Sequence, residues 1–202
     1  MDRVKSFGRI KFPVICAFII ALMLSVVGCP DYLESDAVLE GNIKFCPKKD
    51  DSAQAVVYSV VWDGNTDNTV FEIPDTYDGK DVVWLGGKVT SFQIETDSPY
   101  EYRTGSGETG IHTKSGTTKI EKPFDREVVV ITLKIGKNIN YVSHIAPDFV
   151  VFKEDDVFKV YSVLIRFECS DDNPVFYSKD GKLYKRSGDE LVKDINYAQV
   201  GQ

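Results

Sequence analysis

The sequence predicts a single, mainly β domain of short strands and hairpins over residues 41–202, and three observations lead to this expectation. Runs rich in β-branched and aromatic residues occur at 55–62, 128–135 and 157–169, and such residues favour strands. Asp-Gly pairs stand between several of the apolar runs, as they do in tight turns between strands. No window of the chain has a convincing long helical period of apolar residues.

Each predicted strand has an apolar pattern, and turn or breaker residues mark where it ends. Asp63-Gly64-Asn65 is a turn signal, so the runs on either side of it are predicted to form a hairpin. Pro74 ends the second run because proline cannot donate a hydrogen bond to a ladder. A break at Gly86-Gly87 separates two further strands. The expected strands cover 41–46, 55–62, 69–73, 81–85, 88–95, 128–135 and 157–169, with a last hairpin around Asp180-Gly181.

Residues 96–127 are polar and rich in glycine, with few regularly spaced apolar residues. Long connections of this kind are uncommon in compact domains unless they have a function or are disordered. We therefore expect an irregular loop excursion from the sheet, in the form of a loop or a long irregular hairpin.

Residues 1–28 have the layout of a secretory signal peptide that is removed from the mature protein. Four basic residues open the chain, an apolar run follows over 12–28, and small residues precede a cysteine. The apolar run is shorter than the ~20 residues that a comfortable membrane span needs. An uncleaved anchor helix with an incidental cysteine is the alternative interpretation.

The last residues of this leader, Val26-Val27-Gly28, and the following Cys29 resemble the lipobox of bacterial lipoproteins. In that family the cysteine thiol is acylated, as with palmitate, and the cysteine becomes the new N-terminus. The resemblance implies a lipid anchor on Cys29 and a location in the cell envelope, facing outside the cytoplasm at the cell surface or in the periplasm. Residues 29–40, which have no clear period, are then a tether between the lipid and the domain.

The mature part of the chain is acidic, with 20 Lys and Arg residues against 30 Asp and Glu residues and a formal charge near −10. Nucleic acid is not an expected partner, because its phosphates require a basic protein face. An acidic surface also repels anionic lipid headgroups, so the acyl chains are the expected means of membrane attachment.

Three segments, 70–86, 130–142 and 173–192, resemble the BspA-type leucine-rich-repeat surface proteins of bacteria. The first has a strand ending in Ile-Pro, a Tyr-Asp-Gly turn and a strand ending in glycine. The second has apolar residues at the spacing of one repeat, and the third contains an Asp-Gly-Lys-Leu-Tyr hairpin. The repeat signature does not recur regularly and 96–127 interrupts it, so a degenerate leucine-rich-repeat-like unit is expected rather than a regular horseshoe. The resemblance implies a non-catalytic protein that binds host molecules, matrix or other cells.

Two cysteines, Cys46 and Cys169, lie in the predicted domain. An exported pair is able to form a disulfide, and two buried thiols on separate strands are the alternative. The sequence leaves both open, because it does not show whether the two residues meet.

Aromatic residues provide the candidate partner surface. Tyr100 and Tyr102 lie beside the polar segment, where they are suited to contact a protein or glycan ligand. Tyr77 is a further candidate. Trp62 and Trp84 lie in predicted strands, so packing in the core is the favoured interpretation for both.

No catalytic, metal or cofactor site is expected from the motifs. A G-x-G-x-x-G stretch at 105–110 lacks the buried strand before it and the helix after it that a dinucleotide site needs, so it is predicted to be a flexible loop. Residues 63–68 depart from a calcium loop at the sixth position and read as turn chemistry. His112 and His144 are not spaced as zinc ligands.

The sequence therefore favours a lipid-anchored envelope lipoprotein that acts as a non-catalytic binding or adhesion module. One alternative is a small envelope-anchored enzyme or enzyme inhibitor. Another is a structural or assembly lipoprotein that binds a second envelope protein.

Overall fold

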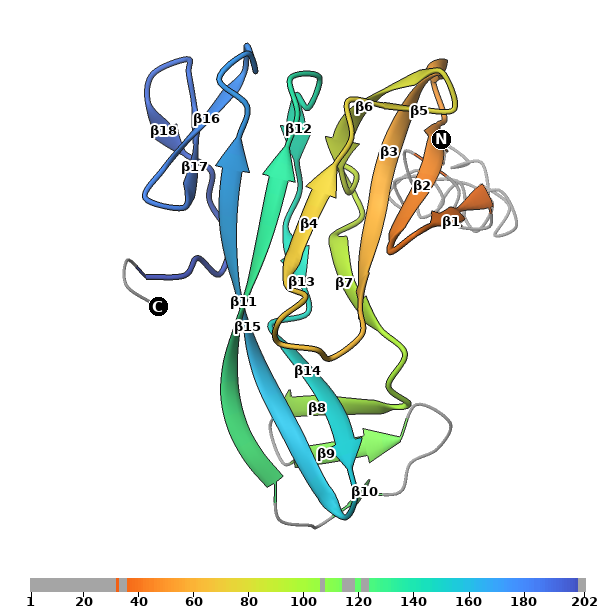
Figure 1. The fold of residues 1–202 in the computed structure, drawn as a ribbon, viewed down its shortest axis with the longest axis vertical. Coiled ribbons are helices and arrows are strands. Elements are labelled where there is room, and N and C mark those ends of the chain that lie inside the picture. The colour runs from red at the N-terminus through yellow and green to blue at the C-terminus, as the bar shows by residue number, and fades with distance from the viewer. Residues whose placement is uncertain (1–31, 33–35, 106–107, 114–118, 121–123, 200–202) are drawn as a thin grey trace, which may run out of the picture. The chain divides into compact units, whose positions relative to one another are not determined.

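The computed structural model describes residues 32, 36–105, 108–113, 119–120 and 124–199 (Figure 1). The predicted fold class is confirmed, since the structure is about 61% strand with almost no helix. Residues from Asp31 onward form a compact unit by themselves. No helix in the described ranges is long and apolar enough to cross a membrane. The predicted leader and Cys29 lie outside these ranges.

The described strands form two larger sheets and two smaller ones. In chain order they are β1 (Val38–Glu40), β2 (Ile43–Lys48), β3 (Asp51–Trp62), β4 (Val70–Ile73), β5 (Thr76–Tyr77), β6 (Lys80–Leu85), β7 (Phe92–Thr96), β8 (Tyr100–Gly105), β9 (Glu108–Thr113), β10 (Lys119–Ile120), β11 (Phe124–Ile135), β12 (Tyr141–Val142), β13 (Ile145–Ala146), β14 (Phe149–Glu154), β15 (Val157–Cys169), β16 (Phe176–Lys179), β17 (Lys182–Lys185) and β18 (Glu190–Leu191).

The chain coils between the two larger sheets, here called sheet A and sheet B, and the strands that successive turns of the coil add to each sheet run parallel to one another. In sheet A, β6 and β7 together lie beside β3, and β12 and β13 lie beside β6 and β7. In sheet B, β4 and β15 lie on either side of β11, and β14 is added antiparallel to β15. The chain passes from β3 to β4, then from β6 and β7 to β11, and then from β12 and β13 to β15. This path makes three successive turns of a coil.

Equivalent residues of each turn are stacked in rows by the parallel registers. Phe71, Leu133 and Phe167 occupy one row of sheet B, and all three are buried. Val57, Leu85 and Val142 occupy a buried row of sheet A. Both rows belong to one continuous buried cluster, so the main core lies between the two sheets.

The predicted hairpin between 55–62 and 69–73 is wrong, because β3 belongs to sheet A and β4 to sheet B. Trp62 on β3 is fully buried, and so is Phe71 on β4. Placing the two strands in different sheets puts the apolar residues of both into the shared core. The indole Nε1 of Trp62 donates to the carbonyl of Asn65 at 2.9 Å, which fixes the connection between the sheets.

The predicted break at Gly86 has a steric cause. Gly86 has a φ of +67°, and a Cβ at this position would lie 2.0 Å from Ser143 Oγ and 2.5 Å from the backbone nitrogen of Phe92. The Ser143 hydroxyl accepts a hydrogen bond from that same nitrogen at 2.8 Å. This hydrogen bond joins the segment between β6 and β7 to the segment between β12 and β13, which lies beside it in the next turn of the coil.

Two of the predicted Asp-Gly turns have the expected geometry. Asp78 and Gly79 connect β5 to β6 with φ values of 49° and 72°, and Asp180 and Gly181 connect β16 to β17 with φ values of 54° and 75°. Positive φ at both central residues is the requirement of a two-residue type I′ hairpin, and glycine meets it without steric cost.

Residues 96–127 are more regular than predicted. β8 and β9 form an antiparallel hairpin and β10 adds to it, which makes a small separate sheet. The alternating apolar residues of this segment explain the difference, because Tyr102 and Ile111 face each other across the hairpin and pack on a buried cluster with β14 and β15. The predicted tether, 29–40, also ends in a strand, since β1 pairs with β2.

The C-terminal segment is joined to the coil through Asn173. This side chain is 1% exposed, and its amide nitrogen donates to the carbonyls of Gly136 and Ile139, both at 2.8 Å. Its amide oxygen accepts from the backbone nitrogens of Val175 and Phe176 at 2.9 and 2.7 Å. These four bonds connect the loop after β15, and with it the small sheet of β16, β17 and β18, to the loop after β11.

Candidate functional site

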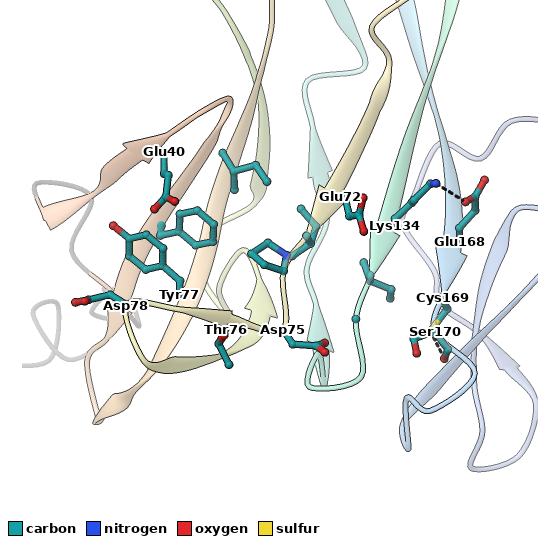
Figure 2. A pocket seen from close by; sticks show the side chains of 16 residues that line it. Glu40, Glu72, Asp75, Thr76, Tyr77, Asp78, Lys134, Glu168, Cys169 and Ser170 are labelled. Atoms are coloured by element: carbon teal, nitrogen blue, oxygen red, sulfur yellow. Dashed lines mark hydrogen bonds and ion pairs between the residues drawn. The ribbon is translucent and has the colours of Figure 1, made fainter.

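A cleft of about 840 Å³ lies where β4, β11 and β15 end, and β1, β2 and β5 border it on the other side (Figure 2). Its walls therefore come from six strands in four separate stretches of the sequence: β1 and β2, β4 and β5, β11, and β15. The residues that line it are Glu40, Ile43, Phe45, Glu72, Ile73, Pro74, Asp75, Thr76, Tyr77, Asp78, Lys134, Ile135, Gly136, Glu168, Cys169 and Ser170.

One wall of the cleft carries a row of alternating charges. The parallel registers place Lys134 on β11 directly beside Glu72 on β4 and Glu168 on β15. Because side chains alternate along a strand, the buried residues on either side of this row point inward and the charged residues point outward. Lys134 Nζ lies 3.5 Å from Glu168 Oε2, and both side chains are about half exposed. A pair this open to solvent adds little stability, so the row matters for the charge that it presents.

The opposite wall is aromatic. The rings of Phe45 on β2 and Tyr77 on β5 are stacked, with centroids 4.1 Å apart and planes 1° from parallel. Phe45 is buried and Tyr77 is half-buried, so Tyr77 forms the accessible part of the pair. Figure 2 shows Glu40 and Asp78 beside the Tyr77 ring, which places carboxylates next to an aromatic surface.

Asp75 fixes the base of the cleft. One oxygen of its side chain accepts from the backbone nitrogen of Lys137 at 2.8 Å, and its carbonyl accepts from Asn138 Nδ2 at 3.1 Å and from the nitrogen of Val82 at 2.9 Å. A Cβ at Gly136 would lie 1.9 Å from Asp75 Oδ1, so the glycine permits the contact. The loops after β4 and β11 are thereby held together, which keeps the cleft in one shape.

The formal charge of the cleft is strongly negative. Five carboxylates line it, and Lys134 is the one cationic side chain among the lining residues: Glu40, Glu72, Asp75, Asp78 and Glu168 supply the negative charge. A concave surface with charge of one sign concentrates counterions and ligands of the opposite sign. Together with the aromatic wall, this composition suits a ligand that carries positive charge and some apolar surface.

The thiol among the lining residues is not suited to act as a nucleophile. Burial raises the pKa of the Cys169 thiol to about 11, so this group is protonated at neutral pH and is a poor nucleophile. The lining residues include no histidine that would serve as its base. Within the part of the chain that the structure describes, no group of three or more His, Cys, Asp or Glu side chains is placed to hold a metal ion.

The structure does not bring Cys46 and Cys169 together as a disulfide. No disulfide joins the two residues. Cys46 is buried in a cluster with Val56 and Trp84, whereas Cys169 packs against the main core and lines the cleft. The two cysteines therefore occupy separate apolar environments, as in the alternative considered for the sequence.

Tyr100 and Tyr102, the predicted partner surface, pack the β8–β9 hairpin against neighbouring strands and also line a separate cavity of about 380 Å³. The ring of Tyr100 meets that of Phe158 edge to face with centroids 4.8 Å apart, and the ring of Tyr102 lies 5.2 Å from that of Phe149. Both tyrosines are half-buried. Neither tyrosine lines the acidic cleft. The aromatic candidate that lines it is Tyr77.

The two tryptophans pack as the sequence predicted. Trp62 is fully buried and meets Phe152 and Tyr161 edge to face, with centroids 5.3 and 5.1 Å apart. Trp84 is 7% exposed, and the ammonium groups of Lys48 and Lys88 lie 4.6 and 5.2 Å from its ring centroid.

The 63–68 motif forms turns, as the sequence predicts. Asp63 Oδ1 accepts from the nitrogen of Asn65 and Asn65 Oδ1 accepts from the nitrogen of Asp67, each at 2.9 Å, which is the Asx-turn pattern. The 105–110 stretch is not the predicted flexible loop, because Gly105 ends β8 and residues 108–110 begin β9, so these residues belong to the hairpin. The two histidines have different environments. His112 is buried on β9, and Nδ1 of His144 lies 2.7 Å from the carbonyl oxygen of Asp194.

Sequence reasoning missed most of the cleft residues, among them Phe45 and the charged residues Glu72, Lys134 and Glu168. Alternation along each strand indicates that the three charged residues point outward. Their meeting depends on the register between strands, and no local signal in the sequence states that register. No family model, no curated protein and no solved structure matches this chain.

Proposed function

We propose that the protein is a lipid-anchored lipoprotein of the cell envelope that works as a non-catalytic binding module, with the acidic cleft as its binding site. The single observation that carries the binding role is the cleft itself, in which five carboxylates face one lysine beside the Phe45–Tyr77 stack. The ligand that fits this surface is cationic and partly apolar.

The proposed location in the cell envelope is supported by the signal-peptide layout and by the lipobox-like residues up to Cys29. Acyl chains bind the bilayer by the hydrophobic effect, at about 0.8 kcal/mol per buried CH₂, so an acidic domain can be held at a membrane that its surface does not attract. In this arrangement the domain presents the cleft to soluble or neighbouring molecules.

The adhesion role follows from the resemblance to BspA-type repeat proteins. The stacked rows of equivalent residues, such as Phe71, Leu133 and Phe167, favour a short array of repeated turns. Two of the three resembling segments also border the cleft, because 70–86 includes β4 and β5 and 130–142 includes the end of β11.

The anchor is tested by the Cys29→Ala variant in a bacterial host that acylates lipoproteins. We expect the wild type to partition into the detergent phase and to have the mass of a diacylated or triacylated chain that begins at Cys29. The variant should move to the aqueous phase. Cys16→Ala is the matched control, because Cys16 lies within the predicted leader and its loss should leave the mature protein unchanged. Equal partitioning of the wild type and Cys29→Ala would contradict the anchor.

The cleft is tested by its affinity for poly-L-lysine, used as a cationic probe without a defined backbone geometry at the site. The Glu72→Lys variant should bind this probe at least tenfold more weakly than the wild type. Glu190→Lys changes the net charge equally on β18, outside the cleft, and should have a much smaller effect. Equal losses in both variants would mean that the probe reads only net charge, and the cleft would not be the binding site.

A further inference from the structure

The two larger sheets end at different places on the side of the coil that faces the cleft. Sheet A continues beyond β3 with β2 and β1, whereas sheet B ends at β4. β4 pairs with β11 on one side, and none of the described strands pairs with its other side. One turn of the coil is therefore incomplete in sheet B.

The open side of β4 has backbone groups directed away from the sheet. The nitrogen of Thr132 on β11 donates to the carbonyl of Thr69, which places Thr69 in the set of residues that bond to β11. In a parallel ladder alternate residues bond to the same neighbour, so the N–H and C=O groups of Val70 and Glu72 point to the free edge. The side chains of these two residues are exposed, whereas Phe71 and Ile73 point into the core.

The free edge of β4 opens into the acidic cleft. Glu72 of β4 lies on one side of the cleft and Glu40 of β1 on the other (Figure 2). Ile73 of β4 and Phe45 of β2 also line the cleft. The cleft thus occupies the position in which a further strand of sheet B would lie, opposite the two extra strands of sheet A.

We propose that the cleft binds an extended segment of a partner protein, which adds as a strand to the free edge of β4. In the added strand, side chains would alternate between the cleft interior and the outer face. The inward residues would meet Ile43, Phe45 and Ile73 and are apolar, and the outward residues would meet Glu72 and are Lys or Arg. The occupant is thus a basic segment with alternating apolar residues, which complements the five carboxylates. This inference rests on the proposed function and specifies the partner.

A second copy of this chain fits the edge less well than a basic segment. The mature chain has 30 acidic and 20 basic residues, so two copies repel each other. Free edges of this kind are otherwise sites of aggregation, and the charged residues around β4 oppose pairing with an acidic copy.

The experiment measures fluorescence anisotropy of labelled eight-residue peptides with the folded protein. The parent peptide alternates Lys and Val, and a second peptide has Glu in place of Lys. Two further peptides carry backbone N-methyl groups, one on every Lys and the other on every Val. Strand addition uses the N–H groups of one alternating set, so one methylated peptide should bind at least tenfold more weakly than the other. The Glu peptide should show no binding.

Protein variants locate the site. Glu72→Lys should weaken binding of the parent peptide at least tenfold, and Glu190→Lys should change it less than twofold. Val70→Pro removes one N–H from the free edge and leaves the hydrogen bonds to β11 in place, so it should weaken the parent peptide in a variant whose circular dichroism is unchanged.

Several results would overturn strand addition. If both methylated peptides bind as tightly as the parent, the cleft recognises charge alone, and the proposed binding function stands without the added strand. Absence of parent binding, or equal effects of Glu72→Lys and Glu190→Lys, would also overturn it. A dimer of the wild type that Glu72→Lys abolishes would assign the edge to a second copy. Loss of poly-L-lysine binding at the cleft would instead reject the proposed function.

Discussion

The Asn173→Ala substitution should be one of the most destabilising single changes in the domain. Asn173 is 1% exposed and makes four hydrogen bonds, two donated to the carbonyls of Gly136 and Ile139 and two accepted from the nitrogens of Val175 and Phe176. Alanine removes all four and leaves the backbone partners in an environment with little access to water. At about 1 kcal/mol for each bond, the free energy of unfolding should fall by about 4 kcal/mol.

This loss is large relative to the whole stability of a domain, which is typically about 5–15 kcal/mol. Urea unfolding followed by circular dichroism measures it, because a pure stability change shifts the midpoint and leaves the slope unchanged. Asn140→Ala is the control. Asn140 is exposed, and an exposed Asn→Ala change should alter the free energy of unfolding by no more than about 0.5 kcal/mol.

Hydrogen exchange separates a local effect from a global one. In Asn173→Ala the amides of Val175 and Phe176 should lose protection first, because they donate to the deleted oxygen. The amide of Ile131, within the long β11 strand, should still exchange only through global unfolding, so its protection should fall only by the loss of global stability. A loss of stability no larger than that of Asn140→Ala, with both loop amides still protected, would refute the role of Asn173 as the connection between the loops.

Two further predictions concern the break in the coil and the thiol in the cleft. Gly86→Ala should lower the free energy of unfolding by at least about 2 kcal/mol more than Gly41→Ala, because both residues have positive φ but only Gly86 has neighbours within 4 Å of a new Cβ; equal losses, measured by urea unfolding, would refute the steric argument. Burial raises the pKa of the Cys169 thiol to about 11, so at pH 8 this thiol should react with iodoacetamide far more slowly in the folded protein than in the urea-unfolded protein, and the folded-state rate should rise towards pH 11. Because folding favours the neutral thiol, the contribution of Cys169 to stability is complete below the ordinary thiol pKa and is lost as the pH approaches 11. A folded-state rate equal to the rate in urea at pH 8 would contradict this.

Local signals in the sequence predicted the parts of the fold that depend on neighbouring residues. The Asp-Gly pairs at 78–79 and 180–181 predicted turns because glycine tolerates the positive φ that these turns need. The β-branched run at 128–135 predicted a strand, and β11 contains it. The position of Trp62 in such a run predicted its burial.

Pairing between distant strands could not be predicted in the same way. Alternation along 55–62 and 69–73 shows which side chains share a face, but it does not state whether the two strands belong to one sheet or to facing sheets. A turn signal favoured the hairpin, and burial of Trp62 and Phe71 in a shared core outweighed it. The cleft depends on the same missing information, because Glu72, Lys134 and Glu168 become neighbours only through the registers of β4, β11 and β15.

Hydrogen bonds between loops explain how the cleft keeps its shape although six strands border it. Asp75 joins the loops after β4 and β11, and Asn173 joins the loops after β11 and β15. These contacts fix the floor before any ligand arrives, and a preformed site avoids the entropic cost of ordering loops on binding. The charged residues Glu72, Lys134 and Glu168 take no part in these loop contacts. Lys134 and Glu168 form only an exposed ion pair with each other. Substitutions at Glu72 should therefore change ligand binding while the fold is retained, whereas substitutions at Asp75 or Asn173 should change stability first.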